Sequence, residues 1–188
     1  MKMTAYDMPT SLNVGGVEMP IRYGWRAVLD ILIAQNDPEL NTEQKLIVML
    51  QILFPGWRDI PKEHIEEAAV KACEFIDCGQ KKSGVPKPRT MDWEQDAAIL
   101  IPAINERAGK EVRADPNMHW WTFFGYYMSI GESLFSSILQ IRSKKAQGKK
   151  LEKWEQEFAR ENKHLIEIKA AAEREEIQQE KQDILKWL

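Results

Sequence analysis

The sequence contains little of what marks a secreted or membrane-spanning protein. Only two of its 188 residues are cysteines, too few for the disulfide framework that stabilises small secreted domains. No uninterrupted apolar run approaches the roughly 20 residues that a transmembrane helix needs. Residues 1–5 also lack the apolar segment of a signal peptide. We therefore expect a protein without membrane spans that works in a reducing cytoplasm.

Residues with catalytic or metal-binding potential are also scarce. The three histidines, His64, His119 and His164, fall in three different segments, so we expect no three-histidine metal site. Cys73 and Cys78 are five residues apart, which differs from the C-x-x-C spacing of zinc and redox pairs. The sequence has no G-x-S-x-G or H-E-x-x-H motif and no phosphate-binding glycine loop. These absences argue against an enzyme and predict neither a cofactor nor a metal.

The charge distribution argues against nucleic acid as the main partner. The formal net charge is −3, so no overall field attracts DNA, RNA or an anionic membrane. Two basic stretches, 81–82 and 142–153, could contact phosphates, and Trp154 could stack on a base. However, residues 154–188 carry nine acidic and six basic residues and would repel a nucleic-acid backbone. We therefore favour a solvated hinge at 142–153 between a globular body and a charged arm.

Apolar residues at helical spacing predict that most of the body is α-helical. Start and stop signals divide it into five helices, at residues 25–36, 42–54, 61–79, 92–104 and 116–142. Asn41 or Thr42 caps the second helix, and Asp115 caps the fifth with Pro116 in its first turn. Pro102 predicts a kink or an early end of the fourth helix.

The N-terminal residues have the pattern of a small β-hairpin. Gly15-Gly16 separates two short extended segments and suits a tight turn, because glycine tolerates positive φ. Pro20 cannot donate to a strand ladder and therefore belongs on an edge. An isolated hairpin is marginal in water, so it must pack on the helices or pair with another chain, and an exposed edge would permit self-association.

Aromatic residues are concentrated in residues 119–127, which hold His119 and six aromatic side chains. Four of them have the i, i+3, i+4, i+7 spacing of a buried helix face: Trp120, Phe123, Phe124 and Tyr127. Trp121 points about 100° away from Trp120 on a helix, so one face cannot bury both. Since aromatic residues are enriched at protein interfaces, Trp121 and Tyr126 are candidate partner-binding residues.

His119 begins the aromatic segment and has two interpretations. A general base would need an acidic or nucleophilic partner, and the sequence identifies none. The second interpretation is structural: a histidine in the first helical turn can be oriented by a capping group or a backbone carbonyl. We favour the structural interpretation.

The C-terminal residues predict a long, charged helix. Several apolar positions between Leu151 and Ile168 are spaced by three, four or seven residues, as on a surface that pairs in a coiled coil. Trp154 and Phe158 are the candidate partner-binding residues there. A continuous helix over 151–188 would be roughly 57 Å long. We thus predict an all-α fold, a bundle of five to six helices with an N-terminal hairpin, divided into a globular domain (1–145) and a C-terminal helical arm (146–188).

The order of these motifs resembles the bacteriophage gp-fifteen family of tailed phages and prophages of Gram-positive bacteria. The matching positions are Arg26, Leu29, Phe75-Ile76, Gly79, Gln95-Asp96, His119-Trp120-Trp121, Phe123 and Ile141-Arg142. The resemblance covers roughly residues 12–145 and does not include the arm. Two positions depart from the pattern: Gly24-Trp25 replaces an acidic-aromatic pair, and residues 106–114 lack a tyrosine.

This resemblance implies a non-catalytic role in phage tail assembly. Such proteins are similar in role to tail assembly chaperones, which act in the host cytoplasm and are absent from the finished virion. The implied partners are the tape measure protein, which is long, helical and aggregation-prone, and other tail proteins. Two alternatives remain: a structural adaptor or minor protein of the tail, and a helical nucleic-acid-binding protein.

Overall fold

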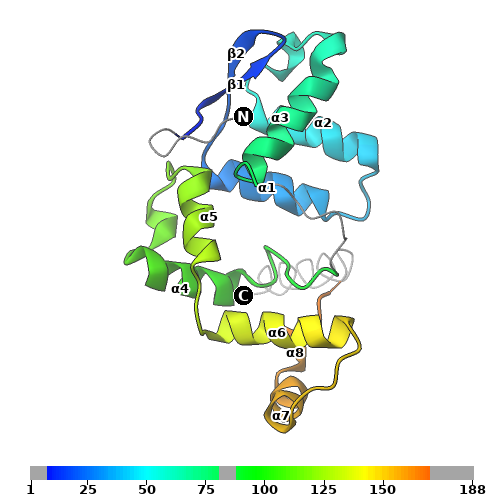
Figure 1. Cartoon of the computed structure of the whole chain (residues 1–188), viewed down its shortest axis with the longest axis vertical. Helices are drawn as coiled ribbons and strands as arrows, with labels where there is room; N and C mark the ends of the chain where they lie inside the picture. The colour runs from blue at the N-terminus through cyan, green and yellow to red at the C-terminus, as the bar shows by residue number, and fades with distance from the viewer. Residues whose placement is uncertain (1–7, 81–87, 170–188) are drawn as a thin grey trace, which may run out of the picture.

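The computed structural model describes residues 8–80 and 88–169 and is mostly helical, as predicted (Figure 1). A two-stranded antiparallel hairpin precedes the helices. The strands and α-helices are β1 Ser11–Val14, β2 Val17–Pro20, α1 Trp25–Gln35, α2 Thr42–Leu53, α3 Ile65–Ile76, α4 Ala97–Ala108, α5 Trp120–Met128, α6 Leu134–Ala146, α7 Lys153–Glu161 and α8 Lys163–Ile166. Short 3-10 turns, η1 Trp57–Asp59, η2 Lys62–His64 and η3 Val112–Ala114, lie between them.

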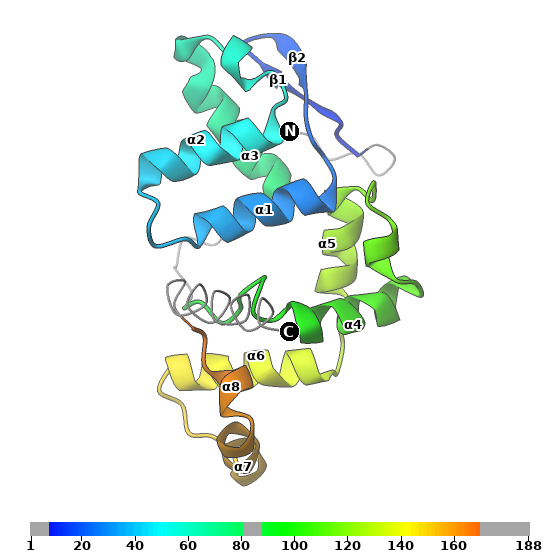
Figure 2. The same ribbon diagram turned by 180° about the vertical axis from the view of Figure 1, so that it is seen from behind.

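The molecule is elongated, and its elements follow one another along the long axis. The hairpin, α1, α2 and α3 form one end, α4 and α5 lie in the middle, and α6, α7 and α8 form the other end (Figures 1 and 2). The main hydrophobic core lies among α1 to α5 and the hairpin, whereas a smaller separate core lies between α6 and the segment that holds α7 and α8.

The predicted hairpin is confirmed, and its turn is fixed to α3. Gly15 and Gly16 have φ of 58° and 81°, the left-handed conformations of a two-residue turn between paired Val14 and Val17. The Gly15 amide donates to the Glu67 carboxylate at 2.9 Å. Because hydrogen-bonded pairs alternate along a hairpin, the Pro20 nitrogen faces outward. Strand addition to β2 would therefore lack a donor there.

The predicted start of the second helix is confirmed in detail, whereas the third helix is shorter than predicted. Asn41 caps α2 through a capping box with Gln44, in which each side chain accepts from the other residue's amide at 2.9 Å. The third helix is preceded by the η2 turn, so its α-helical part begins at Ile65 rather than at Pro61. At its other end, α3 stops at Ile76, and Gly79, predicted to end it, closes the following turn with φ of 70° and donates its amide to the Glu74 carbonyl.

The fourth predicted helix is wrong at its start and its end. Asp92 does not begin it; its carboxylate instead accepts from the amides of Glu94 and Gln95 in a turn, and α4 begins at Ala97. Pro102 lies inside α4, which continues to Ala108. Pro102 leaves one carbonyl, that of Ala98, without its helical donor, and because Ala98 is exposed, water can solvate it.

The fifth predicted helix is two helices. Asp115 does not cap it, because α5 begins only at Trp120 and the residue at its N-cap is His119. The Asp115 carboxylate instead forms an ion pair with Lys110 at 2.7 Å. Residues 129–133 then break the helix, and Ser133 starts α6 with a capping box to Ser136. The serine-rich local signal overrides the apolar periodicity that suggested one helix through 142.

The predicted continuous C-terminal helix is wrong over the part that the structure describes. α7 ends at Glu161, a turn at Asn162 separates it from the single turn of α8, and the chain is extended at Glu167. An isolated rod would leave its apolar residues in water, whereas the observed turn lets Phe158 and Ile166 join the smaller core against α6. The remainder of the predicted rod, 170–188, lies outside the described residues.

Candidate interaction surfaces

His119 is held as a structural residue at the start of α5. Its Nδ1 accepts the Trp121 amide at 3.0 Å, and its Nε2 lies 2.9 Å from the Pro9 carbonyl. These partners require the neutral tautomer with its proton on Nε2. Burial correspondingly lowers the pKa of His119. Both ring nitrogens are thus occupied, which supports the structural interpretation over the general base.

The predicted aromatic core stripe is confirmed. Trp120 and Phe123 are fully buried, and the ring of Phe123 stacks on Trp25 at 4.6 Å between centroids. Trp120 also donates its indole N–H to the Ile76 carbonyl at 2.8 Å, which satisfies its one polar group. The other two members, Phe124 and Tyr127, are partly buried against the same core.

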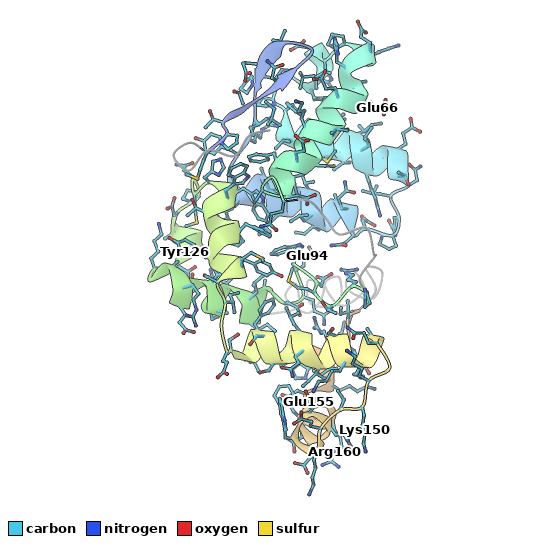
Figure 3. The ribbon with its side chains drawn as sticks, in the orientation of Figure 1. Glu66, Glu94, Tyr126, Lys150, Glu155 and Arg160 are labelled. Carbon is cyan, nitrogen blue, oxygen red and sulfur yellow. The ribbon has the colours of Figure 1, made fainter. Side chains whose placement is uncertain are left out.

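Trp121 and Tyr126, the candidates on α5, are partly buried. The indole of Trp121 donates to the Phe75 carbonyl at 2.9 Å, and its ring stacks on that of Phe75. Trp121 therefore secures α5 against the end of α3. Tyr126 packs at the edge of the main core and lies on the side of α5 near α4 (Figure 3). Partner binding by these two residues remains a prediction.

Trp154 and Phe158, the candidates on α7, lie at one end of the molecule, whereas α5 lies in the middle (Figure 1). Trp154 is 49% exposed, and its indole nitrogen donates to the Glu152 carboxylate at 3.1 Å. Phe158 is partly buried in the smaller core. The four candidates therefore do not form one patch, and Trp154 is the one with a largely open face.

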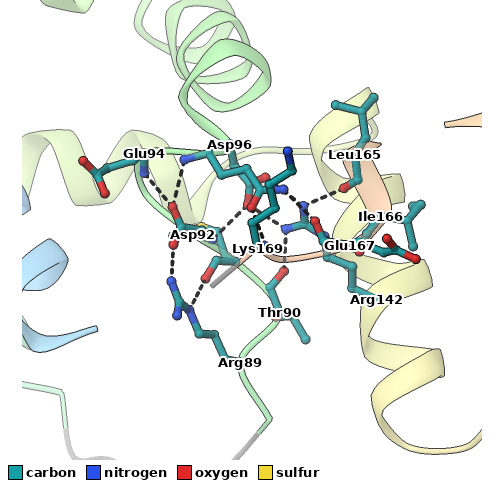
Figure 4. A network of polar contacts seen from close by, with 12 residues as sticks. Arg89, Thr90, Asp92, Glu94, Asp96, Arg142, Leu165, Ile166, Glu167 and Lys169 are labelled. Atoms are coloured by element: carbon teal, nitrogen blue, oxygen red, sulfur yellow. Dashed lines mark hydrogen bonds and ion pairs between the residues drawn. The ribbon is translucent and has the colours of Figure 1, made fainter. Parts of the chain in front are cut away.

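Arg142 attaches the segment after α7 to the body of the molecule (Figure 4). Its guanidinium is almost completely buried and forms a bidentate pair with Asp96, at 2.7 and 2.9 Å. Its other N–H groups donate to the carbonyls of Thr90, Leu165 and Ile166, at 3.0, 2.6 and 3.2 Å. All five donors are thereby used, the condition under which a buried arginine is tolerated.

The neighbouring side chains extend this network in both directions. Asp96 also accepts the Asp92 amide at 2.9 Å, and Asp92 in turn forms an ion pair with Arg89. The Gln95 side-chain amide donates to the Glu167 carbonyl at 2.6 Å and accepts the Lys169 amide at 2.9 Å. The body therefore holds residues 165–169 mainly by their backbone.

A second buried contact joins α7 to α6. Glu155 is fully buried, and its carboxylate accepts from Lys144 at 2.6 and 2.8 Å. The Lys144 ammonium and the Glu152 amide lower the pKa of the Glu155 carboxyl. We did not predict this pair from the sequence. The pattern that could have indicated it is a lysine and a glutamate eleven residues apart with a glycine between them, where the chain can turn back.

Other exposed groups were missed because nothing in the sequence distinguishes them from core residues. Met128 and Leu134, which flank the link between α5 and α6, are 59% and 49% exposed.

A shallow cavity of about 480 Å³ lies beside the Arg142 network and includes Lys145, His164 and Lys169 in its lining. Within residues 8–80 and 88–169 no cluster of three or more His, Cys, Asp or Glu side chains could hold a metal ion.

The comparisons with known proteins identify the family. Among the described residues, no helix is long and apolar enough to span a bilayer. Neither the curated proteins nor the solved structures gave a match. The model of the family described as "Bacteriophage Gp15 protein" matches residues 6–168. This match extends beyond the expected 12–145 and includes α7 and α8. The chain therefore belongs to the bacteriophage Gp15 protein family.

Proposed function

We propose that this protein is a non-catalytic tail assembly chaperone or accessory factor that binds the tape measure protein during tail morphogenesis. It would act in the cytoplasm of the host bacterium and leave before the virion is complete. The proposal rests on membership of the phage family together with one structural observation. That observation is the exposed Trp154 on α7.

Trp154 has the surroundings of a residue that anchors a protein partner. Its ring is about half exposed at one end of an elongated molecule. Exposed charged residues surround it in sequence on α7 and just before: Lys150, Lys153, Glu157, Arg160 and Glu161. An aromatic side chain with a polar rim is the usual arrangement at the centre of a binding site, where tryptophan is enriched. A long helical protein with exposed apolar positions offers a matching surface.

Co-expression with the tape measure protein tests this proposal. We expect the two proteins to co-purify at mild salt and the tape measure protein to stay soluble. Trp154→Ala should reduce the recovered complex at least about tenfold, because truncation of an anchoring tryptophan typically costs about 2 kcal/mol or more. Leu134→Ala is the matched control, since Leu134 is also 49% exposed but lies at the start of α6. Absence of a wild-type complex would contradict the proposal.

Two observations separate the chaperone from the alternatives. A structural adaptor would be retained in purified tails, whereas a chaperone would be absent from them. A nucleic-acid-binding protein would bind DNA with an affinity that falls steeply as salt rises. Gene order gives an inexpensive further check, because we expect the gene to lie between those of the major tail protein and the tape measure protein.

A further inference from the structure

The face of α6 beneath α7 and α8 is an apolar surface covered by a segment of the same chain. Ile138 and Ile141 on α6 are fully buried, and with Ile166 they form a core that is separate from the main one. Phe158 and Leu165 pack around its edge. Residues 151–169, the docking segment, contribute one almost completely buried apolar side chain, that of Ile166, and several partly buried ones. Polar contacts supply the rest of the attachment.

Most of those polar contacts are made to backbone groups of the docking segment, so they depend little on which side chains the segment carries. Arg142 donates to the carbonyls of Leu165 and Ile166 at the C-terminal end of α8, where a cation favours the exposed carbonyls of any helix. Gln95 also contacts backbone groups, the Glu167 carbonyl and the Lys169 amide. Among residues 8–80 and 88–169, one buried ion pair involves a side chain of the segment, and it joins Lys144 to Glu155.

The link between α6 and the docking segment has the properties of a hinge. Residues 147–150 are exposed, and Gly148 has φ of 66° with open space where a side chain would lie. Few buried apolar contacts and an exposed polar connection characterise segments that open without global unfolding. Opening of the docking segment would expose this face of α6 without removing the buried residues of the main core.

We propose that this face of α6 is a docking site for an amphipathic helix of a protein partner, which the chain's own docking segment occupies in the free protein. The partner helix would present a carboxylate to Lys144, an apolar side chain in place of Ile166, and its C-terminal carbonyls to Arg142. The proposal rests on the proposed function, because it assumes a helical partner such as the tape measure protein. Opening the site would also move Trp154, which lies within the docking segment.

A synthetic peptide of residues 151–169 with a fluorescent label serves as the probe, measured by fluorescence anisotropy against the full-length protein. Ile166→Asp places a charge in the smaller core and should release the internal segment. We expect this variant to bind the peptide at least tenfold more tightly than wild type does. Val70→Asp, a charge at an exposed position of α3, is the control and should bind as weakly as wild type.

The ion pair provides a test that loss of folding cannot imitate. Adding Lys144→Glu to the Ile166→Asp protein should weaken peptide binding at least fivefold, and a peptide carrying Glu155→Lys should restore it. Equal binding by wild type and Ile166→Asp, or no dependence on these charges, would overturn the proposal. If Ile166→Asp fails to fold, hydrogen exchange of the wild-type protein provides the test. The amides of α7 and α8 should exchange through local opening, without global unfolding. If they exchange only when the whole protein unfolds, the proposal is overturned.

Failure of the peptide to bind can be distinguished from failure of the proposed function. Pull-down of the tape measure protein through Trp154 does not require the α6 face, so it would persist if the peptide fails to bind. A concentration-dependent wild-type dimer that Ile166→Asp abolishes would show that the segments of two copies exchange. That outcome would assign the face to self-association and overturn the partner helix.

Discussion

Replacing Arg142 by glutamine should destabilise the protein more than any change of an exposed ion pair. The substitution removes the bidentate pair with Asp96 and three hydrogen bonds to carbonyls, and it leaves the Asp96 carboxylate buried without its cation. Removing one partner of a buried ion pair typically costs about 3–5 kcal/mol. Because small domains have only about 5–15 kcal/mol of stability in total, we expect a loss of this size to be obvious.

The assay is urea unfolding at pH 7, followed by tryptophan fluorescence and far-UV circular dichroism. Asp96→Asn should also destabilise, because it leaves the buried guanidinium without its carboxylate. The double variant should cost at least about 1 kcal/mol less than the sum of the two single variants, since groups in direct contact are coupled. Lys163→Gln, which breaks the exposed 3.7 Å pair with Glu167, is the control and should cost under about 0.5 kcal/mol.

Either of two results would contradict this role of Arg142. A loss of less than 1 kcal/mol for Arg142→Gln would mean that water or another group replaces the guanidinium at no cost. Strict additivity of the Arg142 and Asp96 variants would mean that the observed pair contributes no coupling in solution.

Three further predictions concern the turn, the histidine cap and the start of α6. Gly15→Ala should destabilise by about 1–3 kcal/mol, because φ is positive and a Cβ would lie 2.6 Å from the His64 ring; Gly16→Ala, with open space around its Cβ, should cost less in the same urea assay. The lowered pKa of His119 means that folding favours its neutral form. The unfolding free energy should therefore be highest above about pH 6.5 and fall as the solution is acidified. His119→Asn should make the unfolding free energy less dependent on pH in this range. Ser133→Ala should cost about 1 kcal/mol through loss of the α6 cap, seen as a lower thermal midpoint, and an unchanged midpoint would contradict the capping contact.

Features that depend on local sequence were predictable. The Gly15-Gly16 turn, the Asn41 cap and the core position of Trp120 each follow from residues within a few positions of one another. A structural role for His119 was also anticipated, although Asp115 and not His119 was predicted as the helix cap. The exact partners of His119 were not anticipated, because the Pro9 carbonyl lies 110 residues away in sequence.

Features that depend on tertiary packing were not predictable from one sequence. Apolar periodicity alone could not show that the chain breaks between α5 and α6 or folds back at Asn162, because both changes bury side chains against distant elements. Asp96 was noted only as a matching family position. Arg142 was also placed in the basic stretch 142–153, which was expected to be a solvated hinge, whereas its side chain is buried at the end of α6. The pairing of Asp96 with Arg142 joins residues 46 apart, and neither residue type predicts burial by itself.

We propose that this protein binds the tape measure protein during assembly and is absent from the finished tail. The most direct measurement is quantitative mass spectrometry of two fractions from phage-producing cells: tape measure complexes isolated from the lysate, and purified tails. We expect the protein in the first fraction in a fixed ratio to the tape measure protein, and less than one copy per tail in the second. A whole number of copies in every purified tail, with none bound to the tape measure protein in the lysate, would contradict the claim and support a structural adaptor.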